Sequence, residues 1–129
     1  METRSAPRVA IELKAVCHID ESQKNKFMLA SGKSFEVRIL DISELGIGIV
    51  SKYFLPRGLI LELDMDGKPF GLDRKIKTKG EIRYCRITKS FENRCGVRFL
   101  DMSDADRKSI AKFVATFERR EFPRVKLAE

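Results

Sequence analysis

One stretch of the sequence decides the fold class: Lys75-Ile76-Lys77-Thr78-Lys79-Gly80-Glu81-Ile82-Arg83-Tyr84. Apolar or small side chains occupy every second position, and charged side chains occupy the positions between them. Because successive side chains of a β-strand point to opposite faces, this period of two predicts a strand with one buried face. The other face then carries an outward row of mostly basic side chains.

The same alternation recurs on both sides of this stretch. Upstream it covers residues 9–17, 35–39 and 59–65, and downstream it covers residues 95–99. Residues 47–50 form a further short apolar strand, in which Gly48 allows another backbone or a ligand to come close. Turn-forming residues separate the segments, including Pro56-Arg57-Gly58 and Asp66-Gly67. The polar stretch 20–33 predicts a long loop, with room for a short extra strand at residues 27–29. Six short strands in succession favour an antiparallel sheet.

The periodicity changes after residue 102. Ser103 and Asp106 have the spacing of a helix N-cap and its carboxylate. An apolar stripe at helical spacing follows, formed by Ile110, Phe113, Val114 and Phe117, and Pro123 is expected to end the helix. The sequence therefore predicts a mainly β fold, a six-stranded antiparallel β-barrel with a C-terminal α-helix. We expect an N-terminal arginine arm at residues 1–8, the barrel plus helix at 9–121 and a C-terminal tail at 122–129.

Length and composition limit the class of protein. The chain has 129 residues, of which 43% are hydrophobic, enough for one domain with its own core. No apolar run approaches the length of a membrane-spanning helix, and the N-terminus lacks the apolar segment of a secretory signal. These features predict a cytoplasmic protein without membrane insertion.

The residues that usually carry chemistry are sparse. The three cysteines (Cys17, Cys85, Cys95) form no C-x-x-C pair, and the only histidine, His18, adjoins Cys17. Neighbouring residues on a strand point to opposite faces and do not chelate one metal. The sequence also lacks a nucleotide-binding glycine loop and a serine–histidine arrangement. We expect free thiols, no metal, no cofactor and no enzymatic activity.

The positive charge is concentrated in one segment. The formal net charge is +7, and between residues 68 and 98 ten lysines and arginines stand against three acidic residues. Such a segment attracts a polyanion, a phosphate-bearing small molecule or an acidic protein surface. A solvated outer face is an equal alternative, because acidic residues interrupt the series.

Two short segments have the residue types of a binding site. The first is Arg4-Ser5-Ala6-Pro7-Arg8, which we expect on a flexible arm before the first strand. Each guanidinium can donate two parallel hydrogen bonds to a phosphate or to a guanine edge. The spacing alone is weak, because arginines are common in basic termini.

The second segment is Asp41-Ile42-Ser43-Glu44-Leu45-Gly46, at the turn between the second and third strands. One interpretation is purely structural, an Asx or Ser turn with Gly46 at a positive backbone angle. In the other, the ionised Asp41 accepts hydrogen bonds from the N1 and N2 donors of guanine, and Ser43 donates or accepts beside it. Both interpretations stay open at this point.

Together the two segments resemble the signature of the PilZ domain family, bacterial receptors for cyclic di-GMP (c-di-GMP). The signature is Arg-x-x-x-Arg before the first strand and Asp/Asn-x-Ser-x-x-Gly at a later turn. The matching positions are Arg4, Arg8, Asp41, Ser43 and Gly46. The strand Gly96-Val97-Arg98-Phe99, followed by Asp101-Met102-Ser103 and a helix, adds to the likeness.

The resemblance implies a fold and a function. It implies a six-stranded barrel with a helix, no enzymatic activity, and c-di-GMP bound by these five residues between the arm and the outer surface of the barrel. We expect a disordered arm to order on binding, so that the ligand changes what the domain presents to a downstream protein partner.

Two other functions remain open. One is a PilZ-like adaptor that acts by protein contact without a nucleotide. The other is a small basic barrel that binds nucleic acid through the basic row of residues 75–83. Nucleic acid is less favoured, because stacking needs exposed aromatic rings and Phe99, Phe113 and Phe117 fit the core.

The C-terminal segment Arg120-Glu121-Phe122-Pro123-Arg124-Val125 repeats the arginine spacing of the arm. No acceptor segment follows it. Three interpretations compete: a solvated helix end, the start of a further domain, or a spare arm that reaches an anion. Basic residues at a helix C-terminus favour the first.

Overall fold

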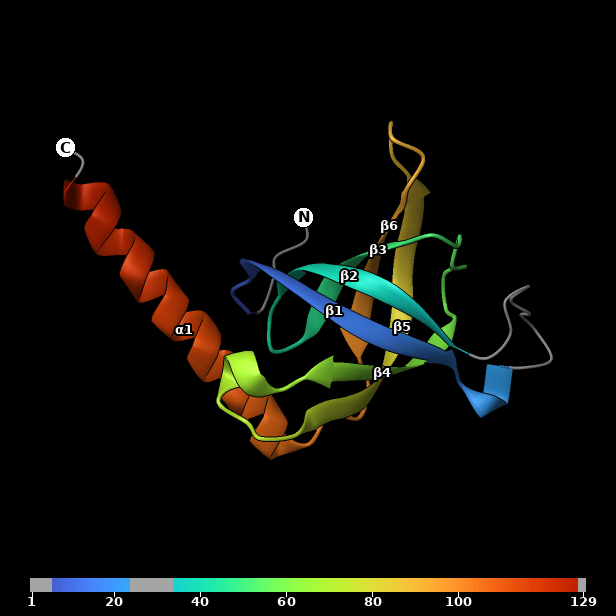
Figure 1. The fold of residues 1–129 in the computed structure, drawn as a ribbon, viewed down its shortest axis with the longest axis horizontal. Coiled ribbons are helices and arrows are strands. Elements are labelled where there is room, and N and C mark those ends of the chain that lie inside the picture. The colour runs from blue at the N-terminus through green and yellow to red at the C-terminus, as the bar shows by residue number, and fades with distance from the viewer. Residues whose placement is uncertain (1–5, 24–33, 128–129) are drawn as a thin grey trace.

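The computed structural model describes residues 6–23 and 34–127, with residues 118–127 as backbone only. These residues form a closed barrel of antiparallel strands, in the order β1-β2-β3-β6-β5-β4, and one long helix (Figure 1). In chain order the elements are β1 (Val9–Ile19), the 3-10 helix η1 (Glu21–Gln23), β2 (Ser34–Ile42), β3 (Gly46–Ser51), β4 (Ile60–Asp66), the 3-10 helix η2 (Lys68–Phe70), β5 (Lys75–Ile87), β6 (Asn93–Phe99) and α1 (Asp104–Leu127). The predicted fold class is confirmed. The extra strand considered at residues 27–29 lies outside the described residues.

The inside of the barrel is filled by the apolar side chains that the alternating pattern predicts to face inward. On β4, for example, Leu61, Leu63 and Met65 are fully buried while Glu62 is exposed. Burying one such aliphatic side chain stabilises the fold by about 1.5 to 3 kcal/mol. The largest fully buried side chains come from β2, β3, β4 and β5, from the 52–59 connection and from α1: Ile39, Ile42, Ile47, Ile49, Leu55, Leu61, Leu63, Met65, Ile76, Ile82, Ile110 and Val114. Cys17 of β1 and Cys95 of β6 are also inaccessible.

The first half of α1 packs against one end of the barrel. Ser103 Oγ accepts a hydrogen bond from the backbone N–H of Asp106 at 3.2 Å, which confirms the predicted N-cap. The Asp106 carboxylate binds the guanidinium of Arg74, 2.6 Å away. Phe113 is half-buried and meets Phe70 edge to face, with ring centroids 5.1 Å apart. These contacts fix the start of the helix, which then continues away from the barrel (Figure 1).

The predicted end of the helix is wrong. The helix does not end at Pro123 but continues to Leu127, so most of the stretch expected as a tail is helical. A proline inside a helix lacks the N–H that would bond the carbonyl four residues earlier, and its ring crowds that carbonyl. Four residues before the end of α1, this cost does not end the helix.

Three strands depart from strict alternation through β-bulges. The register shifts between Ala10 and Leu13 on β1, between Ile39 and Asp41 on β2, and between Ile82 and Tyr84 on β5. A bulge inserts one extra residue, so it changes the face to which the following side chains point. The prediction that Tyr84 shares the inward face of Ile82 is therefore wrong: Tyr84 lies outside, 45% exposed.

Candidate functional site

A pocket of about 760 Å³ lies on the outer face of the barrel, over β3, β6 and β5. It also reaches the residues before β1, the β2–β3 turn and the connection between β3 and β4. Its size is typical of small-molecule sites. Four of its residues are arginines and one is an aspartate: Arg8, Arg57, Arg83, Arg98 and Asp41.

The bulge on β2 places Asp41 in this pocket. Phe35, Val37 and Ile39 alternate inward, and strict alternation would turn Asp41 inward as well. Because the register shifts between Ile39 and Asp41, the carboxylate instead lies at the surface, with its side chain 20% exposed. Asp41 is the last residue but one of β2, not part of the turn that follows.

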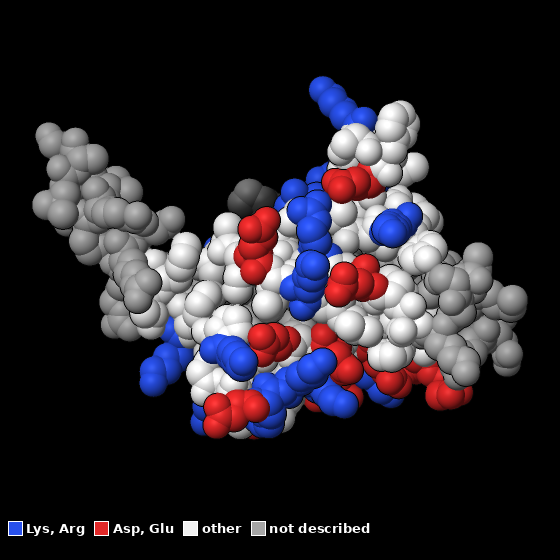
Figure 2. Space-filling model, viewed as in Figure 1, with Lys and Arg blue, Asp and Glu red and all other residues white. Residues whose placement is uncertain are grey.

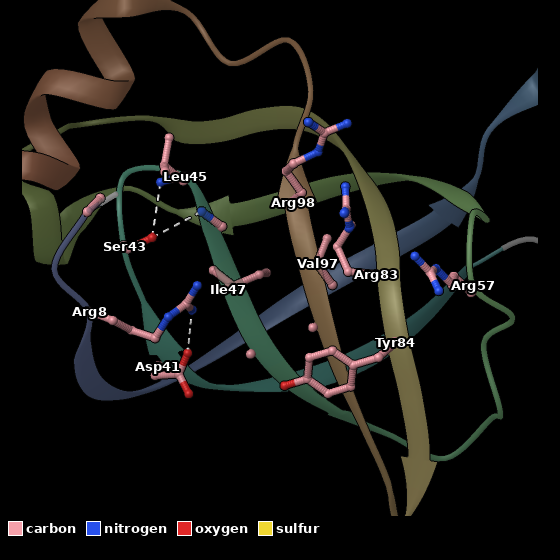
Figure 3. A pocket seen from close by; sticks show the side chains of 14 residues that line it. Arg8, Asp41, Ser43, Leu45, Ile47, Arg57, Arg83, Tyr84, Val97 and Arg98 are labelled. Carbon is pink, nitrogen blue, oxygen red and sulfur yellow. Dashed lines mark hydrogen bonds and ion pairs between the residues drawn. The ribbon is translucent and has the colours of Figure 1, made fainter. Parts of the chain in front are cut away.

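Arg8 docks onto Asp41. Its Nη1 donates to Asp41 Oδ1 at 2.6 Å (Figure 3). Arg94 approaches the other carboxylate oxygen at 3.4 Å. The Arg8 side chain is only 25% exposed, so this residue does not lie on a free arm as expected. Its buried Nε finds no hydrogen-bond partner among the described residues. The ion pair therefore holds Arg8 at the pocket with an unused donor.

Ser43 and Gly46 build the turn beside the pocket. Ser43 Oγ accepts hydrogen bonds from the backbone N–H groups of Leu45 and Gly46 at 3.1 and 3.3 Å, and Ser43 itself is buried. The expected positive backbone angle at Gly46 is wrong, since the positive φ values of described glycines occur at Gly58 and Gly71. A Cβ at Gly46 would instead lie 2.2 Å from the carbonyl oxygen of Val97. Close packing of β3 on β6, not a special dihedral, requires glycine there.

Two paired glycines form the floor of the pocket. Gly48 of β3 lies directly opposite Gly96 of β6. A Cβ at Gly48 would lie 2.8 Å from both carboxylate oxygens of Asp41, and a Cβ at Gly96 would lie 2.3 Å from the ring of Tyr84. The Asp41 carboxylate and the Tyr84 ring thus extend over the glycines, on opposite sides of the floor (Figure 3).

Sequence reasoning missed the β5 side of the pocket. The bulge after Ile82 leaves both Arg83 and Tyr84 exposed, and Arg86 lies over the Tyr84 ring, 5.6 Å from its centroid. This cation–π contact holds the ring in place. The basic row predicted on β5 signalled Arg83, but nothing in the sequence indicated the bulge that exposes Tyr84.

Four of the five predicted site residues line this one pocket: Arg8, Asp41, Ser43 and Gly46. The fifth, Arg4, lies outside the described residues. Within residues 6–23 and 34–127 no cluster of three or more histidine, cysteine or acidic side chains has the arrangement of a metal site. The thiols are free, and burial, together with the charge of Asp64, raises the pKa of Cys17 to about 12. The pocket therefore offers guanidinium donors, one carboxylate acceptor and an aromatic ring, the groups that a phosphate and a purine need.

A comparison with protein-family models shows to which family this chain belongs. The model of the PilZ domain family matches residues 2–116. This chain belongs to the PilZ domain family. The match contains both signature segments and ends inside α1, so the barrel, the pocket and the first half of the helix form the PilZ domain.

Solved structures share the fold at low sequence identity. The Bacillus subtilis inhibitor of motility, MotI/DgrA, has a TM-score of 0.74 and 15% identity, over 93% of this chain and 53% of that one. The PilZ domain of Escherichia coli YcgR with c-di-GMP has a TM-score of 0.60 and 16% identity, over 97% and 98%. The K. pneumonia MrkH–c-di-GMP complex has a TM-score of 0.68 and 16% identity, over 96% and 56%.

The lengths matter for function. This PilZ chain spans about half the length of the MotI and MrkH chains that it matches. The search of curated protein sequences found no significant match. Among the described residues, no helix is long and apolar enough to cross a membrane.

Proposed function

We propose that this PilZ domain is a cytoplasmic c-di-GMP receptor without enzymatic activity, which changes conformation on ligand binding and so regulates a partner protein. The observation that carries the proposal is the Arg8–Asp41 ion pair at 2.6 Å, in one pocket with Ser43 and Gly46. The structural neighbours include two proteins solved with c-di-GMP, YcgR and MrkH.

The groups in the pocket complement both parts of the ligand. A guanidinium binds a phosphate or the O6/N7 edge of guanine through parallel hydrogen bonds. An ionised carboxylate accepts from the N1 and N2 donors of guanine. The exposed ring of Tyr84 offers a face on which a guanine base stacks. Arg8 and Arg4 supply the guanidiniums, and Asp41 supplies the carboxylate. Ser43 and Gly46 hold the turn beside them.

Ligand binding competes with the ion pair. Arg8 and Asp41 bind each other in the structure, whereas c-di-GMP offers each of them a new partner. Breaking the pair releases the segment before β1 from its anchor on β2. The ligand therefore acts on the position of this segment, and through it on the surface available to a partner.

The charges on the other half of β5 argue against nucleic acid binding. Three lysines, here called the lysine row, lie opposite acidic residues of β4 in the pairs Lys75–Asp66, Lys77–Asp64 and Lys79–Glu62. Acidic and basic side chains also alternate over the face of the molecule in Figure 2. A polyanion meets little excess positive charge there, because nearby acids repel phosphates.

A salt-titrated binding comparison tests the proposal. We expect the purified chain to bind c-di-GMP saturably and to bind single-stranded DNA weakly, with an affinity that falls steeply as salt rises. Tight DNA binding with weak c-di-GMP binding would favour the basic-barrel function. An absence of both would favour an adaptor that acts by protein contact alone.

A further inference from the structure

Three arginines line the side of the pocket away from Arg8. They come from different segments, the β3–β4 connection, β5 and β6, and are here called the arginine cluster: Arg57, Arg83 and Arg98. In Figure 3 they lie on the β5 side of the pocket, and Arg8 and Asp41 lie on the β2 side. The PilZ signature contains none of the three.

The backbone fixes Arg57 in this position. The turn around it closes with a hydrogen bond from the N–H of Leu59 to the carbonyl of Pro56 at 3.1 Å. Two further hydrogen bonds join the turn to Ile82 of β5. The Gly58 N–H donates to the Ile82 carbonyl at 2.7 Å, and the Ile82 N–H donates to the Leu59 carbonyl at 2.9 Å. Gly58 has a φ of 90°, which suits glycine. The turn is thus held one residue before Arg83.

The arginine cluster has more positive charge than its neighbours balance. Glu81 is the acidic partner of two members: its Oε1 lies 3.0 Å from Arg98 and 3.9 Å from Arg83. Arg57 forms no ion pair with any described residue. Two guanidiniums therefore share one carboxylate and a third has none, an arrangement that favours an added anion.

We propose that the arginine cluster is a second anion subsite, which binds the second phosphate of c-di-GMP while Arg8 serves the other end of the ligand. The inference rests on the proposed function. A cyclic dinucleotide carries two phosphates, and the pocket presents guanidiniums at two separated ends. Arginine suits this role because its planar fork binds phosphate oxygens in pairs. The subsite makes the pocket select cyclic dinucleotides over single guanine nucleotides.

Calorimetric titration with c-di-GMP and with GMP tests the subsite in the full chain. Arg57→Ala and Arg83→Ala should each weaken c-di-GMP binding roughly tenfold or more, as loss of a charge-assisted hydrogen bond does. GMP binding should fall much less, because GMP has no second phosphate. Both side chains are exposed, so the thermal midpoint should stay unchanged. Lys77→Ala is the matched control, since it removes one exposed positive charge from β5 outside the pocket.

Each outcome decides the inference. A selective loss of c-di-GMP affinity, with a weaker dependence on salt, supports the subsite. Losses equal to those of Lys77→Ala, or equal losses for c-di-GMP and GMP, overturn it and leave the proposed function standing. Failure of the wild-type chain to bind c-di-GMP overturns both.

Free inorganic phosphate separates a dinucleotide subsite from a general phosphate site. Added phosphate that competes with c-di-GMP in the wild-type chain but not in Arg57→Ala would show that the arginine cluster takes free phosphate as well. That result would support an anion subsite that also accepts free phosphate, whereas equal competition in Arg57→Ala would place the phosphate elsewhere and overturn the subsite. We expect little competition at phosphate concentrations comparable to that of the protein.

Discussion

The two halves of β5 carry similar positive charge, yet they differ in what lies across the sheet from them. The lysine row at the start of the strand faces an acidic residue of β4 at each position. After the bulge at Ile82, Arg83 shares one carboxylate with Arg98 and points into the pocket. Charge along the sequence is therefore a poor guide to an anion site. Strand register decides where charge is compensated and where it is in excess.

The comparison predicts two kinds of variant. Changes on the pocket side should alter ligand binding and leave stability nearly unchanged. Changes beside the lysine row should alter stability and leave ligand binding nearly unchanged. The following variants test this division, from the largest expected effect on binding to the smallest.

Removing the Arg8 guanidinium should give the largest effect. Arg8→Ala takes away the group that we expect to bind a phosphate or a guanine edge of the ligand, so c-di-GMP binding should lose about 1.5 to 3 kcal/mol, roughly ten- to a hundredfold. Asp41→Ala should also weaken binding, through the lost acceptor. Calorimetry gives the affinity, and denaturant unfolding checks that the barrel is intact.

Arg8→Lys is the matched variant for this position. It keeps the charge but not the planar fork, so it should restore only part of the affinity. Full recovery by lysine would mean that Arg8 acts as a point charge. An Arg8→Ala variant that binds c-di-GMP like the wild type would contradict the claim that the pocket binds the ligand.

A methyl group on the pocket floor should have the next largest effect. In Gly96→Ala the new Cβ has to displace the Tyr84 ring, which it would otherwise meet at 2.3 Å. The ring then loses its place under the ligand, and we expect a loss of c-di-GMP affinity of roughly tenfold, within the range for one stacked base. Tyr84→Phe keeps the ring and should bind like the wild type. Equal binding by Gly96→Ala and wild type would show that the ring does not contact the ligand.

Beside the lysine row, Asp20 pairs with Lys79 and should control the stability of the fold in acid. Hydrogen bonds from Ser22 and Lys79, the Ser22 hydroxyl foremost, lower its pKa against the opposing effect of burial. The folded state thus binds the proton more weakly than the unfolded state. The resulting stabilisation is present above the ordinary aspartate pKa of about 4 and is lost as the pH falls through the lower folded value.

Asp20→Asn removes this titration. Unfolding midpoints measured across acidic pH should therefore change less with pH in the variant than in the wild type, while c-di-GMP binding at neutral pH stays the same. Asp73→Asn, at an exposed position before β5, serves as the control. Parallel acid profiles for wild type and Asp20→Asn would contradict the account.

Neutralising the lysine row should have the smallest effect on binding. Lys77 is exposed and paired across the sheet with Asp64, outside the pocket. We expect Lys77→Ala to change c-di-GMP affinity by less than about twofold, through long-range screening alone. A larger loss of affinity than that of Arg8→Ala would place the ligand on the lysine row and not in the pocket.

The sequence predicts the strands because their signal is local. Alternating side chains mark five of the strands and a short apolar run marks β3, while the spacing of Ser103 and Asp106 marks the start of the helix. The end of the helix was missed, because α1 continues through Pro123 to Leu127 despite the cost of a proline. The motif residues Arg8, Asp41, Ser43 and Gly46 were found because each segment is short and contiguous.

The rest of the site depends on long-range geometry. The bulges that turn Asp41 and Tyr84 outward arise from pairing between strands, and alternation within one strand does not reveal them. The arginine cluster joins three segments that are separated in the sequence, so no local pattern contains it. The role of Gly46 likewise depends on the carbonyl of Val97 on the neighbouring strand.

An NMR titration of the backbone amides with c-di-GMP tests the central claim most directly. The claim is that the ligand lies on the glycine floor between Asp41 and Tyr84 and not on the lysine row. We predict large shifts for the amides of Gly48 and Gly96 and small shifts for those of Lys75 and Lys77. Large shifts along the lysine row with an unchanged glycine floor would contradict the account.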